Sequence, residues 1–306
     1  MDVAVLFIVF NRPFHTQRVF KKIKEAAPKR LFIAADGPRR DYPADETSCN
    51  QVRKIVSDIQ WPCEVLYLFR QENLGCKLAL SDAITWFFKH VEQGIILEDD
   101  CLPVSSFFYF CSDMLERYKN DPHIFQITGN NFQQGISRGA GSYYFSKYAH
   151  IWGWATWKRA WDYYDLELSN WPLFRMRKEY QAFFASEAEK KYWTKKLDHY
   201  YNNPEKADYW SLQWQFACWQ QGGAIVTPQK NLVTNIGFGS GTHTFIILDH
   251  LIIPSIEFWP PYSEPADSDI CTDADAYTFK HRFKYKGTFV SKVKYHIYRI
   301  LKNWRK

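Results

Sequence analysis

The chain has 306 residues, of which 46% are hydrophobic and 24% are charged, a balance that provides a sizeable core and excludes global disorder. The formal net charge is +6, but residues 280–306 carry ten Lys and Arg and no Asp or Glu, which leaves −4 on residues 1–279. A mildly acidic body excludes a protein-wide basic surface of the kind that binds nucleic acid.

Strand and helix patterns alternate along the first third of the chain. Apolar runs of strand length occupy residues 3–10, 31–35, 65–69 and 94–97, and helical spacing of apolar side chains occupies residues 14–27, 46–59 and 78–90. This alternation predicts crossover connections and a mainly parallel sheet that is covered by helices on both faces.

After residue 100 the pattern changes. A helix at 105–118 and a strand at 124–128 are followed by a loop at 129–142, a Trp- and Tyr-rich, mostly helical region at 148–220 and a short strand at 224–227. We therefore expect one domain over residues 1–250, divided into halves at 1–128 and 129–250. A Pro-rich, acidic arm follows at 251–279, and a basic amphipathic tail follows at 280–306.

Polar residues terminate the predicted strands of the first half. Asn11 and Arg12 follow the first strand, Asp36 follows the second, Asn73 comes after the third, and Glu98-Asp99-Asp100 ends the fourth. In open parallel sheets, ligands bind at the carboxyl ends of the strands, where neighbouring loops converge. These positions are therefore the candidates for a binding site, although ordinary turns and surface ion pairs use the same residue types.

The acidic triplet Glu98-Asp99-Asp100 directly follows the apolar run Gly-Ile-Ile-Leu. Carboxylates at a buried strand end need a cation, and oxygen ligands suit Mg²⁺ or Mn²⁺, with a nucleotide phosphate completing the shell. The alternative is a solvated acidic turn. The sequence contains no GxxxxGKS/T loop and no GxGxxG after the first strand. A bound nucleotide is therefore expected to be held through a divalent metal and loops.

Several short motifs occur in an order that resembles the nucleotide-sugar domain of GT-A glycosyltransferases. They are Asn11-Arg12-Pro13, Phe32-Ile33-Ala34-Ala35-Asp36-Gly37, Asn73-Leu74-Gly75 and Ile96-Leu97-Glu98-Asp99-Asp100. The Glu-Asp-Asp form is similar to that of the N-acetylglucosaminyltransferase I branch and its bacterial relatives. The resemblance covers residues 3–110 well and residues 120–243 more loosely. It implies an α/β, Rossmann-like GT-A fold with a mainly parallel central sheet, a helical acceptor region and a C-terminal extension.

The resemblance implies that the acidic triplet contacts both the metal and the sugar nucleotide. Asp100, its last acid, is expected to be the direct ligand of Mn²⁺ or Mg²⁺, and Glu98 and Asp99 are expected to contact ribose or sugar hydroxyls. His243, in a late loop after a glycine-rich stretch, is a further candidate for contact with the metal or the diphosphate. A lone loop histidine is more often simply exposed, and that alternative stays open.

The other strand ends are expected to form the nucleotide-sugar pocket. By the same resemblance, Asp36 is expected to contact the base of the nucleotide. Asn11 and Arg12 are expected to border the nucleotide, and Asn73 and Gly75 to line the donor pocket. Each of these residues also fits a plain structural role. Asp36 precedes a Gly-Pro turn, Asn-Leu-Gly is itself a common turn sequence, and Arg12 fits a surface salt bridge.

An inverting transfer needs a base that deprotonates the acceptor hydroxyl. In the resembling family this base is an Asp before a Trp, and Ala207-Asp208-Tyr209-Trp210 is the best match in this chain. Relatives have an acidic pair before the Trp, whereas Asp208 stands alone before Tyr-Trp. Asp208 also fits the N-cap of a helix that continues from Ser211. Glu205 and His243 are the next candidates for the base.

The densest aromatic patch is His150-Ile151-Trp152-Gly153-Trp154-Ala155-Thr156-Trp157. Members of the resembling family carry a Gly-Trp segment near the donor sugar and the acceptor, so Gly153 and Trp154 are expected to contact the sugar nucleotide. Glycine permits close backbone approach, and a tryptophan face can stack on a pyranose ring. The alternative is that the aromatic residues, 18% of the chain, are simply core.

The tail from 289 to 304 places apolar residues on one helical face among basic ones, which is typical of a helix on an anionic membrane surface. Docking on the acidic body is the alternative. The chain contains no apolar run of transmembrane length and no pattern of a signal peptide, and its seven Cys include no CxxC pair. We therefore expect a cytoplasmic protein at the inner face of the cell membrane.

These features predict a metal-dependent glycosyltransferase that moves a sugar from a UDP-sugar to a surface-glycan acceptor, free or lipid-linked, with inversion. UDP-GlcNAc is the first donor that the resemblance implies. A non-catalytic carbohydrate-binding protein is one alternative, but it has no need for the acidic triplet. A sugar nucleotidyltransferase is another, but it needs a Gly-rich, Lys- or Arg-bearing loop after the first strand, where this chain has Asn11-Arg12-Pro13.

Overall fold

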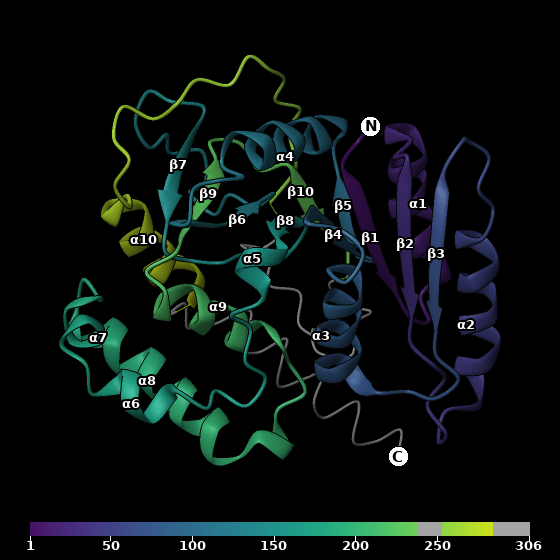
Figure 1. The fold of residues 1–306 in the computed structure, drawn as a ribbon, viewed down its shortest axis with the longest axis horizontal. Coiled ribbons are helices and arrows are strands. Elements are labelled where there is room, and N and C mark those ends of the chain that lie inside the picture. Colours follow the sequence, from purple (N-terminus) through teal and green to yellow (C-terminus); the bar gives the residue numbers. More distant parts are fainter. Residues whose placement is uncertain (238–252, 284–306) are drawn as a thin grey trace, which may run out of the picture.

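The computed structural model describes residues 1–237 and 253–283, which contain an eight-stranded sheet of order β3-β2-β1-β4-β8-β6-β9-β7 (Figure 1). Its strands are β1 (Ala4–Val9), β2 (Arg30–Ala35), β3 (Glu64–Phe69), β4 (Gln93–Glu98), β6 (Ile124–Thr128), β7 (Tyr143–Ser146), β8 (Trp154–Trp157) and β9 (Ala224–Pro228). The short strands β5 (Cys101–Pro103) and β10 (Val233–Asn235) form a separate antiparallel pair.

The sheet is mainly parallel. β1 pairs in parallel with β2 and β4, β2 pairs in parallel with β3, and β6 with β9. β8 lies between β4 and β6 and is antiparallel to both, and β7 is antiparallel to β9. The α/β class and the mainly parallel central sheet predicted from the sequence are therefore confirmed.

Helices cover both faces of this sheet. The helices that do so are α1 (Pro13–Ala26), α2 (Pro43–Val56), α3 (Gly75–Phe87), α4 (Ser105–Arg117) and α9 (Ser211–Gln220). Alternate side chains of β1 point to opposite sides, as strand geometry requires. Val5 and Phe7 belong to a core shared with α1, α2 and α4, whereas Leu6 and Ile8 belong to a core shared with α3 and α9.

Two helices begin earlier than their apolar periodicity predicts. α2 begins at Pro43 and α3 at Gly75, three residues ahead of the predicted starts at 46 and 78. Proline is favoured at the first position of a helix because its φ is already helical and its missing N–H is not needed there. At α3 the residues ahead of Leu78 are Gly75, Cys76 and Lys77, which carry no large apolar side chain, so the sequence pattern places the helix start too late.

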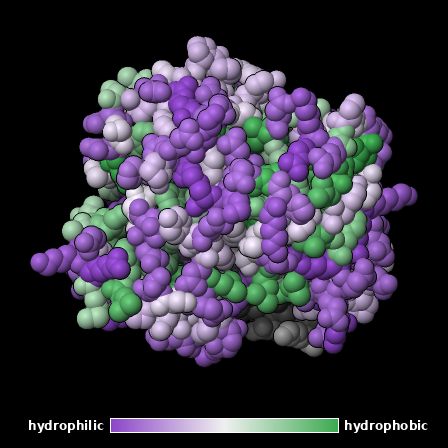
Figure 2. All heavy atoms as spheres, viewed as in Figure 1, coloured by the Kyte–Doolittle hydropathy of each residue, from purple (hydrophilic) through white to green (hydrophobic). Residues whose placement is uncertain are grey.

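The aromatic excess is largely core. The second half adds α5 (Lys158–Trp161), α6 (Trp171–Arg175), α7 (Lys178–Ala182), α8 (Glu187–Asn202) and the 3₁₀ turn Pro204–Lys206. Trp171, Trp193 and Trp219 are buried together in this helical region. Trp154 and Trp214 are buried in the core between the sheet and the helices α3 and α9. The face seen in Figure 2 is correspondingly mostly hydrophilic, with hydrophobic residues in small groups.

Residues 253–269 form no regular helix or strand, and the segment then continues into α10 (Thr272–Thr278) and a π-helical turn (Phe279–Phe283). Asp275 ties α10 to β7: it accepts hydrogen bonds from Ser146 Oγ at 2.5 Å and from the Lys147 backbone N–H at 3.1 Å. Burial raises the pKa of Asp275 to about 7. The body of the protein therefore continues through the expected boundary at residue 280.

The rest of the basic tail, residues 284–306, and the loop 238–252 with His243 lie outside the described residues. None of the helices described in residues 1–237 and 253–283 has the length and hydrophobicity that a membrane span requires.

Candidate active site

Arg12 and the acidic triplet meet where β1 and β4 end. The two strands are neighbours in the sheet, so Arg12, which precedes α1, lies beside the carboxylates that end β4. Its Nε donates to Asp99 Oδ2 at 3.2 Å, its Nη2 also binds Asp99 Oδ1, and its Nη1 donates to Asp100 Oδ2 at 3.1 Å. The structure therefore brings together the first and fourth strand ends, as the sequence predicted.

The charges of this cluster are not balanced. Burial and the neighbouring charges of Asp100 and Asp99 raise the pKa of Glu98 to about 8. Burial also raises the pKa of Asp99, although the Arg12 charge opposes this effect. One guanidinium thus faces three carboxylates, and an added cation is favoured at this strand end.

A glycine approaches the triplet from a distant part of the chain. The Ile236 backbone N–H donates to the Asp100 carbonyl at 2.8 Å, and His15 Nε2 lies 3.1 Å from the Ile236 carbonyl. A Cβ on Gly237 would lie 2.3 Å from Asp100 Oδ2 and 3.0 Å from Arg12 Nη1, so a side chain at this position would displace the Asp100 carboxylate. The sequence pattern did not identify Gly237 as a site residue, because nothing local links it to Asp100.

Asp36 and Asn73 hold the second and third strand ends together. Asp36 accepts hydrogen bonds from Asn73 Nδ2 at 2.9 Å and from the Leu74 backbone N–H at 3.1 Å, and Asn73 Nδ2 also donates to the Gly37 carbonyl at 2.9 Å. Burial raises the pKa of Asp36. Asn11 is further engaged, because its Nδ2 donates to Asp45 Oδ1 at 2.7 Å. These side chains shape the loops of the predicted pocket, and their contact with a nucleotide stays a prediction.

Asp208 lies at the start of α3, beside Gly75. Its Oδ1 accepts a hydrogen bond from the Lys77 backbone N–H at 2.8 Å, which caps this helix from 131 residues away in the sequence. Gly75 has a φ of +78°, and a Cβ there would lie 3.2 Å from Asp208 Oδ1. The N-cap position of α9 is occupied by Trp210 rather than by Asp208.

The cap and the proposed base make different demands on Asp208, so two substitutions separate them. Asp208→Asn keeps an oxygen that accepts from Lys77 N–H, and we expect unchanged stability but loss of transfer if the carboxylate is the base. Asp208→Ala removes the cap and is expected to cost about 1 kcal/mol of unfolding free energy. Urea unfolding and an activity assay on both variants check this. An active Asp208→Asn enzyme would leave Asp208 with a capping role alone.

Trp154 does not face a ligand site in this structure. Its side chain is fully buried. The centroid of its ring lies 5.7 Å from the ring centroid of Trp210 and 5.6 Å from that of Trp214. Gly153 has a φ of +72°, and a Cβ there would lie 2.7 Å from Val233 Cγ2. Glycine is thus required by packing against β10, and Trp154 belongs to the core. A sugar contact by either residue stays a prediction.

The residues of the triplet fit a divalent ion only in part. Within residues 1–237 and 253–283, no group of three or more His, Cys, Asp or Glu side chains is arranged to hold a metal ion. Arg12 already engages both oxygens of Asp99 and Oδ2 of Asp100, which leaves Glu98 and Asp100 Oδ1 as the donors. Such a pair suits an ion whose remaining positions are filled by phosphate oxygens and water.

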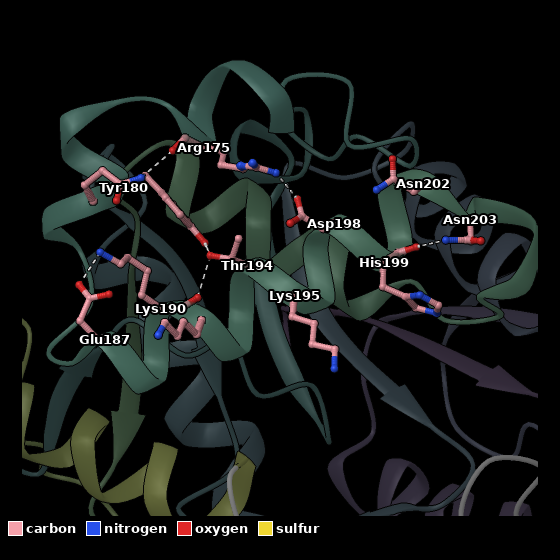
Figure 3. A pocket seen from close by; sticks show the side chains of 12 residues that line it. Arg175, Tyr180, Glu187, Lys190, Thr194, Lys195, Asp198, His199, Asn202 and Asn203 are labelled. Carbon is pink, nitrogen blue, oxygen red and sulfur yellow. Dashed lines mark hydrogen bonds and ion pairs between the residues drawn. The ribbon is translucent and has the colours of Figure 1, made fainter.

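A separate cavity of about 640 Å³ opens between α6, α7 and α8 (Figure 3). Its side chains include the ion pairs Glu187–Lys190 and Arg175–Asp198, together with Thr194 and the hydroxyl of Tyr180. No residue predicted for the site lines this cavity. It is a feature of the helical half, and no local motif marked it in the sequence.

No family model and no curated protein matches this chain. Among solved structures, it is similar to apo UDP-glucose pyrophosphorylase, with 12% identity over 78% of this chain and 94% of that one and a TM-score of 0.41. It is also similar to S. aureus TarS 1-349, with 9% identity over 53% of this chain and 48% of that one and a TM-score of 0.35. A cytidylyltransferase from Leptospira borgpetersenii serovar Hardjo-bovis matches at 12% identity over 68% and 74% of the two chains, with a TM-score of 0.32.

Proposed function

We propose that the protein is a metal-dependent GT-A glycosyltransferase that transfers a sugar from a UDP-sugar, with UDP-GlcNAc as the first candidate, to a surface-glycan acceptor. The observation that carries this proposal is the cluster of Glu98, Asp99 and Asp100 at the end of β4, in which Arg12 pairs with Asp99 and Asp100. This cluster lies at the edge of the parallel sheet where nucleotide ligands bind in folds of this class.

In the proposed reaction, Glu98 and Asp100 would hold a divalent ion, and such an ion would supply positive charge to stabilise the leaving diphosphate. Arg12 holds Asp99 and Asp100 in place, and Asp36 and Asn73 order the loops that border the nucleotide. Asp208 is the proposed base for the acceptor hydroxyl, since its position beside Gly75 puts it at the same edge of the sheet. A base on the acceptor side gives inversion of configuration.

Two observations favour this proposal over its alternatives. The connection from β1 to α1 holds only residues 10–12, so it has no room for the long glycine-rich loop expected of a nucleotidyltransferase. The tryptophans that a carbohydrate-binding protein would present to a sugar are mostly core: Trp154, Trp214 and Trp219 are each buried.

Binding of nucleotide-sugars with and without Mn²⁺ tests the proposal directly. Isothermal titration of the full chain should give Mn²⁺-dependent binding of UDP and of at least one UDP-sugar, with UDP-GlcNAc tried first. ADP-glucose and GDP-mannose serve as controls for recognition of the uracil ring of the nucleotide. Equal affinity for all nucleotides, or binding that EDTA leaves unchanged, would contradict the UDP-specific, metal-dependent proposal.

The basic tail is proposed to hold the enzyme at an anionic membrane, where a lipid-linked acceptor would be found. A chain that ends after Phe283 keeps the packed turn and loses eight of the ten basic residues. We expect it to stay folded, while losing attraction of about 1 kcal/mol for each basic residue near the surface. Sedimentation with anionic and neutral vesicles at rising salt measures this. Equal binding of both chains, or a lowered melting temperature of the shorter one, would support docking of the tail on the body instead.

A further inference from the structure

Arg282 lies in an aromatic cage. Its guanidinium carbon is 4.2 Å from the ring centroid of Phe132, 4.8 Å from that of Trp152 and 5.4 Å from that of Phe283. Its Nε is buried and has no hydrogen-bond partner. Among the described residues no carboxylate forms an ion pair with Arg282, in contrast to Arg12, Arg39, Arg70, Arg117 and Arg175.

The surroundings of this guanidinium are positive or neutral. Burial lowers the pKa of Arg282 to about 10. Burial and the Arg282 charge together lower the pKa of Lys196, and they lower the pKa of His150 well below its ordinary value. The sequence that follows, residues 284–306, contains no Asp or Glu. A desolvated cation without a counter-charge is costly, so it is normally paired.

The position of Arg282 is fixed by packing on both sides of it. The ring of Phe283 lies 4.8 Å from that of Trp193 and 4.9 Å from that of Tyr148. Gln133 Nε2 donates to the Thr278 hydroxyl at 2.8 Å, which anchors the preceding turn of α10. Arg282 is therefore held against the protein rather than extended into solvent, and its rigid fork is ready for an anion.

The cage adjoins the strand ends that carry the acidic triplet. The Trp152 backbone N–H donates to Asn130 Oδ1 at 3.1 Å, and the next residue, Gly153, is so close to β4 that a Cβ there would lie 3.2 Å from Leu97 Cδ2. Leu97 directly precedes Glu98. The aromatic wall of the cage is thus continuous with the edge of the sheet at which the nucleotide is proposed to bind.

We propose that Arg282 binds a phosphoryl group of a substrate. This inference rests on the proposed function, because a nucleotide-sugar or a lipid-linked acceptor supplies such a group. Guanidinium binds phosphate through two parallel N–H donors, and the aromatic faces keep it in that orientation. The phosphoryl group comes either from the donor diphosphate or from an acceptor phosphate.

Four full-length proteins test the assignment: the wild type, Arg282→Met, Arg282→Lys and the control Lys280→Met, which removes an exposed charge from the same turn. Their affinities for UDP, uridine and geranyl phosphate are measured by titration calorimetry. If the donor supplies the group, Arg282→Met weakens UDP binding by roughly tenfold to hundredfold and leaves the affinity for uridine unchanged. Arg282→Lys then recovers part of the lost UDP affinity. If the acceptor supplies it, geranyl phosphate loses affinity instead. Unchanged affinity for both phosphates in Arg282→Met would overturn the inference.

A thermal melt with inorganic pyrophosphate separates this inference from the proposed function. Pyrophosphate should raise the melting temperature of the wild type and of Lys280→Met, but not that of Arg282→Met, even if no UDP-sugar is a substrate. Without ligand, Arg282→Met should melt at the same temperature as the wild type or higher, because a charge without a partner is removed. A lower melting temperature with no response of the wild type to pyrophosphate would show a purely structural arginine and contradict the assignment.

Discussion

Asp100→Ala is expected to lower sugar transfer by roughly a thousandfold, because a preorganised charge at the leaving group is lost. The Mn²⁺-dependent part of UDP binding should disappear with it. The fold should survive, since Asp100 is half-buried and its carbonyl, rather than its carboxylate, holds Ile236. Transfer rates, UDP titrations with Mn²⁺ and a thermal melt measure the three effects.

Asp58→Ala is a matched control for this substitution, because Asp58 forms a surface ion pair with Lys24 and 58% of its side chain is exposed to solvent. It should leave transfer and UDP binding unchanged. Full activity of Asp100→Ala, or activity of the wild type in excess chelator, would contradict a metal at this strand end and leave Arg12 as the cation of the site.

Arg12→Met should destabilise the protein by about 3–5 kcal/mol, because it leaves the buried carboxylate of Asp99 without its partner. Both oxygens of Asp99 bind the Arg12 side chain, and 4% of the Asp99 side chain is exposed. Urea unfolding measures the loss. Arg12→Lys keeps the charge but not the planar fork, so it should recover only part of the stability.

The double variant Arg12→Met/Asp99→Asn identifies the origin of that loss. Removing the buried charge together with its partner should restore part of the unfolding free energy, as expected for two residues in one ion pair. Strictly additive effects of the two substitutions would show that Arg12 stabilises the fold through packing rather than through Asp99.

The first half of the fold and the acidic cluster were predictable from sequence because their signals are local. Apolar runs of strand length followed by polar residues mark β1 and β4, and a parallel pair necessarily brings their carboxyl ends together. This rule alone places Arg12 and Asp100 at the same edge of the sheet. The order of strands in the second half was not predictable, because short strands such as β8 carry no distinct pattern of their own.

The remaining site features depend on contacts between distant segments. Nothing near Asp208 in the sequence indicates that it caps α3, and nothing near Gly237 indicates that it lies against Asp100. The aromatic patch is ambiguous in the sequence for a related reason. A Trp-rich segment has the same composition in a core and in a sugar site, and only the packing of Trp154 against other tryptophans distinguishes the two.

The position of β8 also has a consequence for synthesis of the chain. β4 and β6 are not neighbours in the sheet; each pairs with β8, whose residues come from the second half. Until Trp157 has left the ribosome, the apolar edge of β4 has no partner and is open to pairing with another chain. We therefore expect the two halves to fold as one cooperative unit rather than as separable modules. A fragment cut at residue 128 would keep the acidic triplet but expose that edge.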